Sequence, residues 1–329
     1  TAWYLKASKY IQNTKIKVAF VSTNSIVQGE QVGILWKELF SNYGIKIHFA
    51  HQTFNWSNEA KSNAAVHVVI IGFAQFDSTN KRIFEYENIK SNAHEKSAKN
   101  INAYLVEGDD IVIEKRRKPL CNVLNIIKGN YYAKSEGLII EEKDLDYLVK
   151  NEPNAKKWIK LLIGADEFIN NRKRYCLWLV DCPPDELRKM PLVMERVNRV
   201  REDRLKSTDK GMQNLAPIRF RETNNPDKCI VIPVVSSEKR PYIPIGFIDK
   251  NTISTNGNLI IPNGDLFLFG QLTSLMQMSW VKYTCGRLES RFRYSKDIVY
   301  NNYPFPKNVS EKQKKAVEEK AQNVLNIRS

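Results

Sequence analysis

The sequence has few of the features that place a chain in a membrane or hold a small secreted domain together. No apolar run approaches the ~18 to 20 residues that cross a bilayer, and no signal peptide opens the chain. Its 5 cysteines are scattered without a CxxC pair, and its 4 histidines form no HExxH or other ligand spacing. We therefore expect no membrane segment, no histidine-held metal, and a cytoplasmic protein with reduced, mostly buried thiols.

Glycine-rich nucleotide loops are missing as well. Neither GxGxxG nor GxxxxGK[ST] occurs in the sequence. An α/β nucleotide-binding unit normally opens with a strand and such a turn, which receives the cofactor at a helix N-terminus. Either the chain binds no nucleotide, or the binding half lies upstream of Thr1. Nuclease signatures and Ser-His-Asp or Cys-His arrangements are also missing, so we assign no cleavage to the chain.

Size and positive charge are what the sequence does have. Its 329 residues suggest about two or three domains. Lysine and arginine number 51 against 36 acidic residues, which leaves a formal net charge of +15. Such an excess favours polyanionic partners such as nucleic acid. A soluble protein with a basic surface is the alternative that charge alone leaves open.

The first eighty residues alternate between helical and strand patterns. We expect helices over 2–11 and 27–43 and strands over 17–23, 45–50 and 65–73. The last of these is a nearly continuous apolar run, typical of a strand that is covered on both faces. This order predicts an α/β fold with a parallel or mixed sheet.

The rest of the chain has a mixed pattern. Polar residues 77–100 indicate a linker or an exposed loop, and an arginine-rich helix is expected to open at Pro191. A capping box from Ser310 to Gln313 predicts a helix at the end of the chain. The other expected elements are strands over 102–108, 110–116, 175–181, 228–235, 240–247, 258–263, 265–270 and 286–295, and helices over 142–151 and 271–286.

Two aromatic residues stand in the polar stretch before the apolar run. An enzyme that acts on the exocyclic amine of a base must take the base out of the duplex and stack it on an aromatic surface. Phe54 or Trp56, expected on a loop between two strands, would suit that role, although a ring folded back on the sheet edge is the alternative. The "DCPPDEL" stretch from Asp181 is similar to the Asn/Asp-Pro-Pro-Tyr/Phe loop of amino-methyltransferases. Cys182 and Asp185 break that pattern, so we interpret it as a strand-to-helix corner.

Basic clusters beyond residue 110 are interleaved with aromatic residues and are candidates for contact with a phosphate backbone. For any one cluster the alternative is a solvated basic surface. A second candidate lies in residues 286–295: if they form one strand, Glu289, Arg291 and Arg293 share a face. These side chains could read base edges, because a carboxylate accepts a hydrogen bond from the cytosine amine and an arginine donates two to guanine. A salt bridge across the strands is the alternative interpretation. The backbone candidates are Lys115, Arg116, Arg117, Arg172, Arg174, Arg196, Arg199 and Arg293.

Six long blocks of the sequence closely resemble the MmeI-like family of type IIL restriction-modification proteins. They are "VAFVSTNSIVQGEQVGILW", "IHFAHQTFNWSNEAKSNAAVHVVIIGF", "INAYLVEGDDIVIEKRRKPLC", "YCLWLVDCPPDELRKMPLVMERVNRVREDR", "VIPVVSSEKRPYIPIGF" and "CGRLESRFRYSKDIVYNNYPFP". The resemblance implies the second half of a Rossmann-like adenine methyltransferase sheet in residues 1–78. It further implies a target-recognition domain with its linker in 79–302 and the start of a helical segment in 303–329.

The family modifies an adenine in a short DNA site with S-adenosylmethionine. Its cofactor motif, catalytic loop and nuclease lie upstream of the matching blocks. The resemblance therefore implies a fragment that does not methylate by itself and has no catalytic residue of its own. It implies duplex DNA and the upstream half of the same protein as partners, with the cofactor bound mainly by that half.

The resemblance also implies roles for individual residues. Phe54, or failing it Trp56, would stack on the extruded adenine, and a strand-rich region after residue 230 would read the sequence. A stand-alone specificity subunit and a nucleic-acid-binding protein without base specificity are the alternatives. The implied rim of the target loop is Asn24, Gln28 and Glu30, with helix capping by Ser25 or Asn24 as the alternative, and the implied base readers are Glu289, Arg291, Asn256, Glu238 and Arg240.

Overall fold

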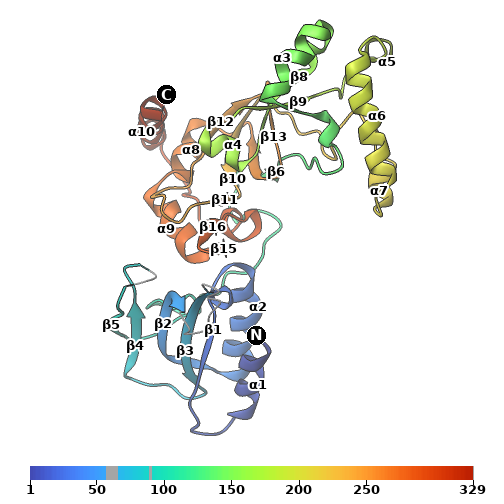
Figure 1. Cartoon of the computed structure of the whole chain (residues 1–329). Coiled ribbons are helices and arrows are strands. Elements are labelled where there is room, and N and C mark those ends of the chain that lie inside the picture. Colours follow the sequence, from blue (N-terminus) through green and yellow to red (C-terminus); the bar gives the residue numbers. More distant parts are fainter. Residues whose placement is uncertain (57–65, 89–90, 329) are drawn as a thin grey trace. The chain divides into compact units, whose positions relative to one another are not determined.

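The computed structural model describes residues 1–56, 66–88 and 91–328 (Figure 1). Two compact units divide the chain, and each contains two separate stretches of sequence. The first unit comprises Thr1–Cys121 and Ser279–Pro304, and the second comprises Asn122–Met278 and Phe305–Ser329. Helix α9 (Leu275–Thr284) runs from the second unit into the first.

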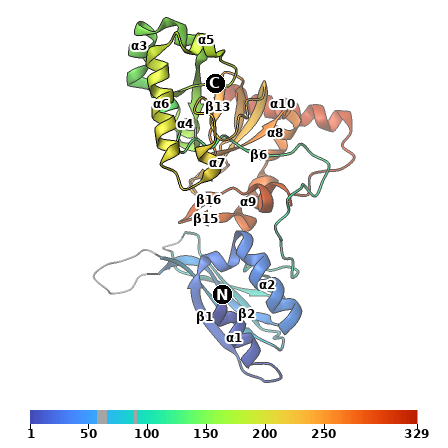
Figure 2. The same cartoon turned by 90° about the vertical axis from the view of Figure 1, so that its right-hand side faces the viewer.

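The first unit is a five-stranded mixed sheet in the order β1-β3-β2-β4-β5 with α1 and α2 packed on it (Figure 2). Strands β2 and β4 are parallel, and every other neighbouring pair in this sheet is antiparallel. The predicted α/β fold with a mixed sheet is therefore confirmed. Its elements are α1 (Ala2–Tyr10), β1 (Val18–Thr23), η1 (Asn24–Val27), α2 (Gly29–Tyr43), β2 (Lys46–Trp56), β3 (Val66–Ala74), β4 (Lys81–Glu85), β5 (His94–Ala98), β15 (Gly286–Leu288), β16 (Arg291–Arg293) and η4 (Lys296–Tyr300).

Aromatic rings join the two helices to this sheet. Tyr4 of α1 stacks on Phe73 of β3 with ring centroids 5.5 Å apart, and its ring also meets the edge of Trp36 of α2 at 5.9 Å. All three side chains are buried. Helix α2 ends at Gly44, which adopts φ 60° as a left-handed cap. The amphipathic pattern and the glycine stop therefore predicted this helix correctly.

Residues 77–100 are not the linker or exposed loop that their polarity suggested. They contribute β4 and β5 to the edge of the sheet, and Ile83 of β4 is fully buried. Lys81 is also buried, because its ammonium pairs with the Asp77 carboxylate at 2.8 Å and donates to Asn100 at 3.1 Å. The segment has many exposed polar residues, but its ion-paired Lys81 and its Ile83 are buried, which its polarity alone did not predict.

Residues 102–108 and 110–116 were expected to form short strands, and that expectation was wrong. The Asn102 carboxamide accepts from the backbone N–H of Tyr104 at 3.0 Å, which closes a turn, and Leu105 has φ 58°. The following segment is tied to the second stretch of this unit: Arg116 N–H donates to Asp297 at 3.0 Å, and Leu120 N–H donates to Asn301 at 2.7 Å.

The second unit contains two four-stranded sheets, in the orders β12-β10-β14-β6 and β13-β8-β9-β7. Strands β8 and β13 are parallel. Its elements are β6 (Ile127–Lys128), η2 (Glu136–Leu138), β7 (Ile139–Glu141), α3 (Glu142–Asn151), η3 (Pro153–Trp158), β8 (Ile159–Ile163), α4 (Ala165–Asn170), β9 (Arg174–Leu177), α5 (Pro184–Leu187), α6 (Pro191–Leu205), α7 (Lys210–Gln213), β10 (Lys228–Pro233), β11 (Val235–Ser236), β12 (Gly246–Asp249), β13 (Thr252–Ser254), β14 (Asn258–Pro262), α8 (Leu266–Leu272) and α10 (Glu311–Arg328).

Helix α6 begins at Pro191, as predicted, and a buried carboxylate caps it. Glu152 accepts from the backbone N–H groups of Leu192 and Val193, both at 2.9 Å. A negative charge at a helix N-terminus is stabilising, and proline at the first position leaves no further N–H to satisfy there. The apolar stripe of this helix, which includes Val193, is buried.

Residues 265–270 were expected as a strand but begin helix α8. The Asp265 carboxylate accepts from Leu268 N–H at 2.8 Å and so caps this helix. A short apolar run suits either a buried strand or a buried helix, and the cap decides between them. Helix α10 packs on α8, where a Cβ on Gly270 would lie only 2.6 Å from Val317. The predicted capping box is confirmed, because Ser310 N–H donates to Gln313 Oε1 at 2.9 Å.

Candidate nucleic-acid interface

The two rings singled out in the sequence lie on a strand, not on a loop. Phe54 and Trp56 belong to β2, where they face Val68 and Val66 of β3. Phe54 is half-buried, and Trp56 is 41% exposed. Residues 57–65, which follow, lie outside the described residues. The end of β2 therefore presents both rings from a paired and rigid element.

A β-bulge sets the direction of the Phe54 side chain. His51 faces Ile70 and Phe54 faces Val68, so β2 has two residues between these pairs where β3 has one. Residues three apart in a regular strand point to opposite faces, but the extra residue returns Phe54 to the face of His51. Both rings accordingly contact the same partner, Tyr86, which follows β4.

Four rings form a layered cluster on this face of β2. Phe54 stacks on Tyr86 with centroids 5.1 Å apart and planes 20° from parallel, and His51 stacks on Phe84 at 4.1 Å and 6°. A hydrogen bond of 2.8 Å joins His51 Nδ1 to the Tyr86 hydroxyl. Offset stacking of this kind contributes about 0.5 to 1.5 kcal/mol per pair beyond area burial. We call His51, Phe54, Phe84 and Tyr86 the aromatic cluster.

Burial keeps the polar groups of the aromatic cluster uncharged. Desolvation lowers the pKa of His51 and raises the pKa of Tyr86. Because an imidazole pKa below its usual range leaves the ring neutral at pH 7, the pair shares one proton in its hydrogen bond. The cluster is therefore a neutral aromatic surface in which Phe54 and Tyr86 are nearly parallel, with Trp56 beside Phe54 at 6.4 Å.

The opposite face of the β2 end lines a small polar cavity of about 180 Å³. Gln52 and Thr53, the two residues of the bulge, belong to its wall, and Gln52 donates to Leu105 O at 3.0 Å. The other lining residues are Val27, Gln28, Tyr104, Leu105, Lys282, Tyr283 and Arg287. All of them belong to the first unit.

Of the three target-loop residues, the structure brings only Gln28 to this cavity. Gln28 is the N-cap residue of α2, but its side chain makes no capping hydrogen bond. Capping of α2 by Ser25 or Asn24, the alternative weighed from the sequence, does not occur. Asn24 is half-buried in η1, and the Glu30 carboxylate pairs with Lys115 at 3.1 Å.

Residues 286–295 form a hairpin, not one strand. Strands β15 and β16 pair antiparallel, and the chain turns at Glu289, which has φ 59°. Glu289 therefore does not share a strand face with Arg291 and Arg293, as was expected. The Glu289 and Arg291 side chains form an ion pair at 2.9 Å and remain 73% and 44% exposed. Phe292 between the two arginines is buried, so Arg291 and Arg293 point to solvent.

The remaining base-reading candidates belong to the second unit. Glu238 and Arg240 are exposed just after β11, and Asn256 is half-buried between β13 and β14. The backbone N–H of Asn256 donates to Asn130 O at 2.9 Å. The Asn130 carboxamide also bonds to the backbone of Asn224, so Asn130 anchors this loop through the backbone of Asn256 and not through its side chain.

The basic candidates divide into exposed cations and cations that bond within the protein. Arg116, Arg117 and Arg199 are exposed. Arg174 pairs with Glu167 at 3.0 Å and is only 19% exposed, and Arg196 donates to Ile139 O at 2.9 Å. A guanidinium that already satisfies buried partners is a poorer phosphate ligand than an exposed one. Lys115 and Arg172 lie between these cases, since each is exposed and pairs with a carboxylate, Glu30 and Asp166 respectively.

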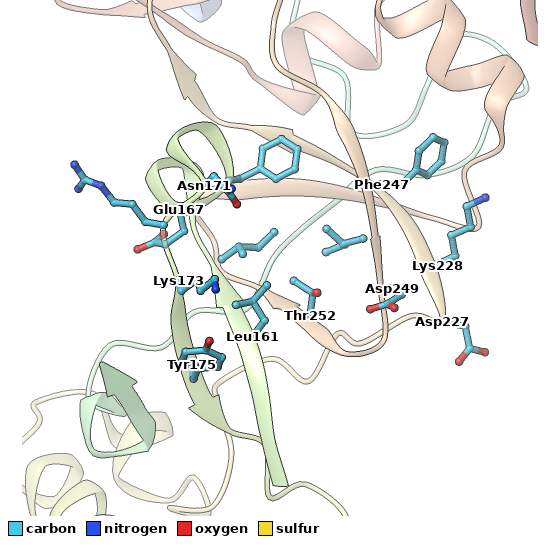
Figure 3. A pocket seen from close by; sticks show the side chains of 14 residues that line it. Leu161, Glu167, Asn171, Lys173, Tyr175, Asp227, Lys228, Phe247, Asp249 and Thr252 are labelled. Carbon is cyan, nitrogen blue, oxygen red and sulfur yellow. The ribbon is translucent and has the colours of Figure 1, made fainter. Parts of the chain in front are cut away.

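The second unit has a larger hollow of about 780 Å³ that no sequence pattern predicted (Figure 3). Its wall combines strands from both sheets, with Leu161 from one and Phe247 from the other. Figure 3 shows Lys228 near Phe247 at one end, and the Lys228 ammonium lies 4.7 Å from the centre of that ring. Arg172, predicted to contact DNA, is part of the lining.

Three expectations about other chemistry can be compared with the described residues. The "DCPPDEL" stretch forms the expected corner: α5 starts with Pro184, and Glu186 accepts from the Trp158 indole at 2.9 Å. None of the five cysteines is in a disulfide, and burial raises the pKa of Cys176 to about 12. Across residues 1–56, 66–88 and 91–328, no cluster of His, Cys, Asp or Glu is suited to a metal ion.

No helix in the described part of the chain combines the length and the apolar character needed to span a membrane.

Comparisons with known proteins identify two consecutive family matches, the second of which includes residues of both units. The family model of the MmeI DNA-methyltransferase domain matches residues 1–85, and that of the MmeI target recognition domain matches residues 107–307. The first match lies in the unit with the mixed sheet and the aromatic cluster. The chain thus combines part of a DNA-methyltransferase domain with a target recognition domain. It belongs to the MmeI family.

Two relatives match almost the whole chain. DNA methyltransferase A of Bacillus subtilis (strain 168) is 41% identical over 332 residues, which cover 100% of this chain and 37% of that protein. A solved structure of the type IIL restriction-modification enzyme MmeI in complex with DNA is 46% identical, with a TM-score of 0.90, over 99% of this chain and 44% of that one. The chain therefore spans less than half the length of either relative.

Proposed function

We propose that this chain recognises a DNA sequence and positions an adenine within an S-adenosylmethionine-dependent DNA methyltransferase of a type II restriction-modification protein. The observation that carries this proposal is the aromatic cluster at the end of β2, of which all but Tyr86 lie within the residues that match the MmeI methyltransferase domain. A flat neutral ring on a rigid strand suits a base that has left the duplex. The match to a target recognition domain supports the sequence-reading role.

Phe54 is the ring that we assign to the extruded adenine. Tyr86 covers one side of it, and the bulge turns the ring to the same face as His51. A base stacking on Phe54 would extend a column of rings that already exists. Trp56, which is more exposed and 6.4 Å from Phe54, lies where it would cover the flank of such a base.

We assign the contacts with the duplex around that adenine to polar side chains in residues 107–307, which match the target recognition domain. Glu289 and Arg291 stand at the tip of the β15–β16 hairpin, and a hairpin tip suits insertion into a groove. Glu238, Arg240 and Asn256 are proposed as further readers. The exposed Arg116, Arg117, Arg199 and Arg293, with Lys115 and Arg172, are proposed to contact phosphates.

The cofactor is proposed to bind outside this chain. S-adenosylmethionine is a sulfonium cation with a ribose, whereas the described residues that line the cavity beside the β2 end include Lys282 and Arg287 and no carboxylate. Neither its charge nor its volume of about 180 Å³ fits that molecule. The chain's own contribution to methyl transfer would be positioning of the base. Its five scattered cysteines, which form no CxxC pair, favour a cytoplasmic setting.

Replacement of Phe54 tests this proposal. In the methyltransferase that contains this chain, Phe54→Ala should slow methylation by about 5- to 150-fold, because base–aromatic stacking contributes about 1 to 3 kcal/mol. Duplex binding should change much less. Trp3→Ala, which removes a ring that is 70% exposed on α1, serves as the matched control. Equal loss of methylation and binding would show that Phe54 is only a structural ring.

The separate compactness of the second unit favours a second candidate, a stand-alone specificity subunit. Its test is to mix the chain with the upstream half of a methyltransferase domain. Methylation restored by mixing supports a split enzyme, whereas sequence-specific binding by the chain alone supports an autonomous reader. Binding that ignores sequence and disappears uniformly with salt would leave only a polyanion-binding protein.

A further inference from the structure

The end of β2 has two faces with different chemistry. Because of the bulge, His51 and Phe54 lie on the face of the aromatic cluster. Gln52 and Thr53 line the polar cavity. A base stacked on Phe54 therefore cannot occupy the cavity, because the strand itself lies between them. Whatever enters the cavity must be another part of the substrate.

The cavity wall offers donors and positive charge. Lys282 and Tyr283 are exposed on the last turn of α9, and Gln28 reaches the cavity from the start of α2 without capping that helix. Among the described residues, the lining includes no acidic side chain. The Arg287 guanidinium packs over the Phe292 ring at 3.9 Å and donates to Lys282 O at 3.1 Å, so it adds fixed positive charge to the base of the site.

The geometry holds these donors in place. Trp280 of α9 donates to Val299 O at 2.9 Å, which anchors the helix end to η4. A Cβ on Gly29 would lie 3.1 Å from the backbone of Gly286, so α2 and β15 approach closely beside the cavity. Its volume of about 180 Å³ equals that of about six water molecules, which suits a tetrahedral anion and part of a sugar.

We propose that this cavity binds one backbone phosphate of the DNA strand that carries the extruded adenine. This inference rests on the proposed function. On one face of β2 the base would stack against Phe54, and on the other Lys282, Gln28 and Tyr283 would hold a phosphate of the same strand. Extrusion turns a nucleotide about its own backbone, so fixing a neighbouring phosphate holds the strand while the base leaves the stack.

Single-phosphate replacement tests the proposal. The protein that contains this chain is titrated with duplexes carrying its methylation site, in which one phosphate at a time near the target adenine is a neutral methylphosphonate. The wild-type protein should lose affinity at one or two positions, and Lys282→Gln should lose that sensitivity there. Lys282→Gln should also lower the slope of log K against log salt by about 0.9, the value for one phosphate.

Lys9→Gln, an exposed lysine on α1, is the matched control and should keep the wild-type slope and profile. Gln28→Ala should weaken binding at the same phosphate without changing the slope, because it removes no charge. An unchanged methylphosphonate profile in Lys282→Gln would overturn the phosphate site while leaving the methyltransferase role intact. Loss of site-specific binding by the wild-type protein would instead overturn the proposed function itself.

Discussion

Tyr86 lies against Phe54 with ring centroids 5.1 Å apart and planes 20° from parallel, and the Tyr86 hydroxyl is 2.8 Å from His51 Nδ1. Phe54 is in β2 and Tyr86 directly follows β4, a strand that is the neighbour of β2 only in the folded sheet. Tyr86 therefore backs the surface proposed to receive the adenine and is itself held by a hydrogen bond. Its expected role is to position Phe54.

The first prediction separates the ring of Tyr86 from its hydroxyl. Tyr86→Ala should slow methylation by about 2- to 13-fold, because an aromatic pair contributes about 0.5 to 1.5 kcal/mol. Tyr86→Phe keeps the ring and should lose less. The measurement is the single-turnover methylation rate, with DNA affinity measured alongside. A fall in affinity as large as the fall in rate, or identical rates for Ala and Phe, would contradict a positioning role.

The second prediction concerns the hairpin tip. Joint replacement of Glu289 and Arg291 by alanine should relax or alter one position of the methylated sequence, with a change of about 1 to 3 kcal/mol in discrimination there. Sequencing of methylated positions in cellular DNA gives the readout. Alanine at Arg82 and Glu95, another exposed ion pair at 3.4 Å, provides the control. An unchanged methylation pattern would exclude the hairpin pair as base readers.

A third prediction concerns stability. Arg204 is 1% exposed, and its guanidinium donates to carbonyl oxygens of Lys134, Leu215 and Arg219 and to the Ser135 hydroxyl. Burial lowers its pKa, but an arginine stays charged at pH 7. Lysine cannot reach these acceptors in one plane, so several would lose their donor.

Each buried acceptor left without a donor costs about 1 to 3 kcal/mol. Arg204→Lys should therefore destabilise the second unit by about 3 kcal/mol or more, which urea unfolding followed by circular dichroism would measure. Arg199→Lys, an exposed arginine on the same helix, is the control and should change stability little. A midpoint for Arg204→Lys equal to that of the control would disprove the role of Arg204 as a buried hydrogen-bond centre.

The fourth prediction concerns pH. Burial lowers the pKa of His51 in the folded chain below the ordinary value near 6.5. At pH 7.5 the ring is neutral in both the folded and the unfolded chain. As the pH falls below about 6.5, the unfolded chain binds the proton first, so the first unit loses stability until the folded-state pKa is passed.

Replacement of His51 by glutamine should reduce this acid-dependent loss between pH 7.5 and 5.5. His94→Gln is the control, because His94 is exposed on β5. Thermal unfolding at a series of pH values would provide the comparison. The same pH dependence in wild type and His51→Gln would show that another group is responsible.

The sequence predicted those elements whose signals are local. Pro191 opened α6 as expected, Gly44 ended α2, and the Ser310 capping box starts α10. The sequence did not predict which distant strands pair in the sheet. The polar segment contains β4, in which Ile83 is buried and Lys81 pairs with Asp77, and Tyr86 just after β4 lies against Phe54.

In the candidate site, too, some residues were identified from the sequence and others became evident only in the structure. Phe54, Trp56 and Gln28 were identified from the residues and the family resemblance, and the structure puts them at one end of β2 and at the cavity beside it. The bulge that aims Phe54 has no sequence signature, because Gln52 and Thr53 suit a regular strand equally well. Lys282 was not identified either, since the cavity joins segments far apart in the chain.

The central claim, that an extruded adenine rests on Phe54, can be tested by photo-crosslinking. A 5-iodouracil at the target position of the duplex, irradiated in complex with the methyltransferase that contains this chain, reacts with the ring on which it stacks. Mass spectrometry of the product should place the crosslink on Phe54, and Phe54→Ala should abolish it while Trp3→Ala should not. A crosslink elsewhere that survives Phe54→Ala would contradict the account.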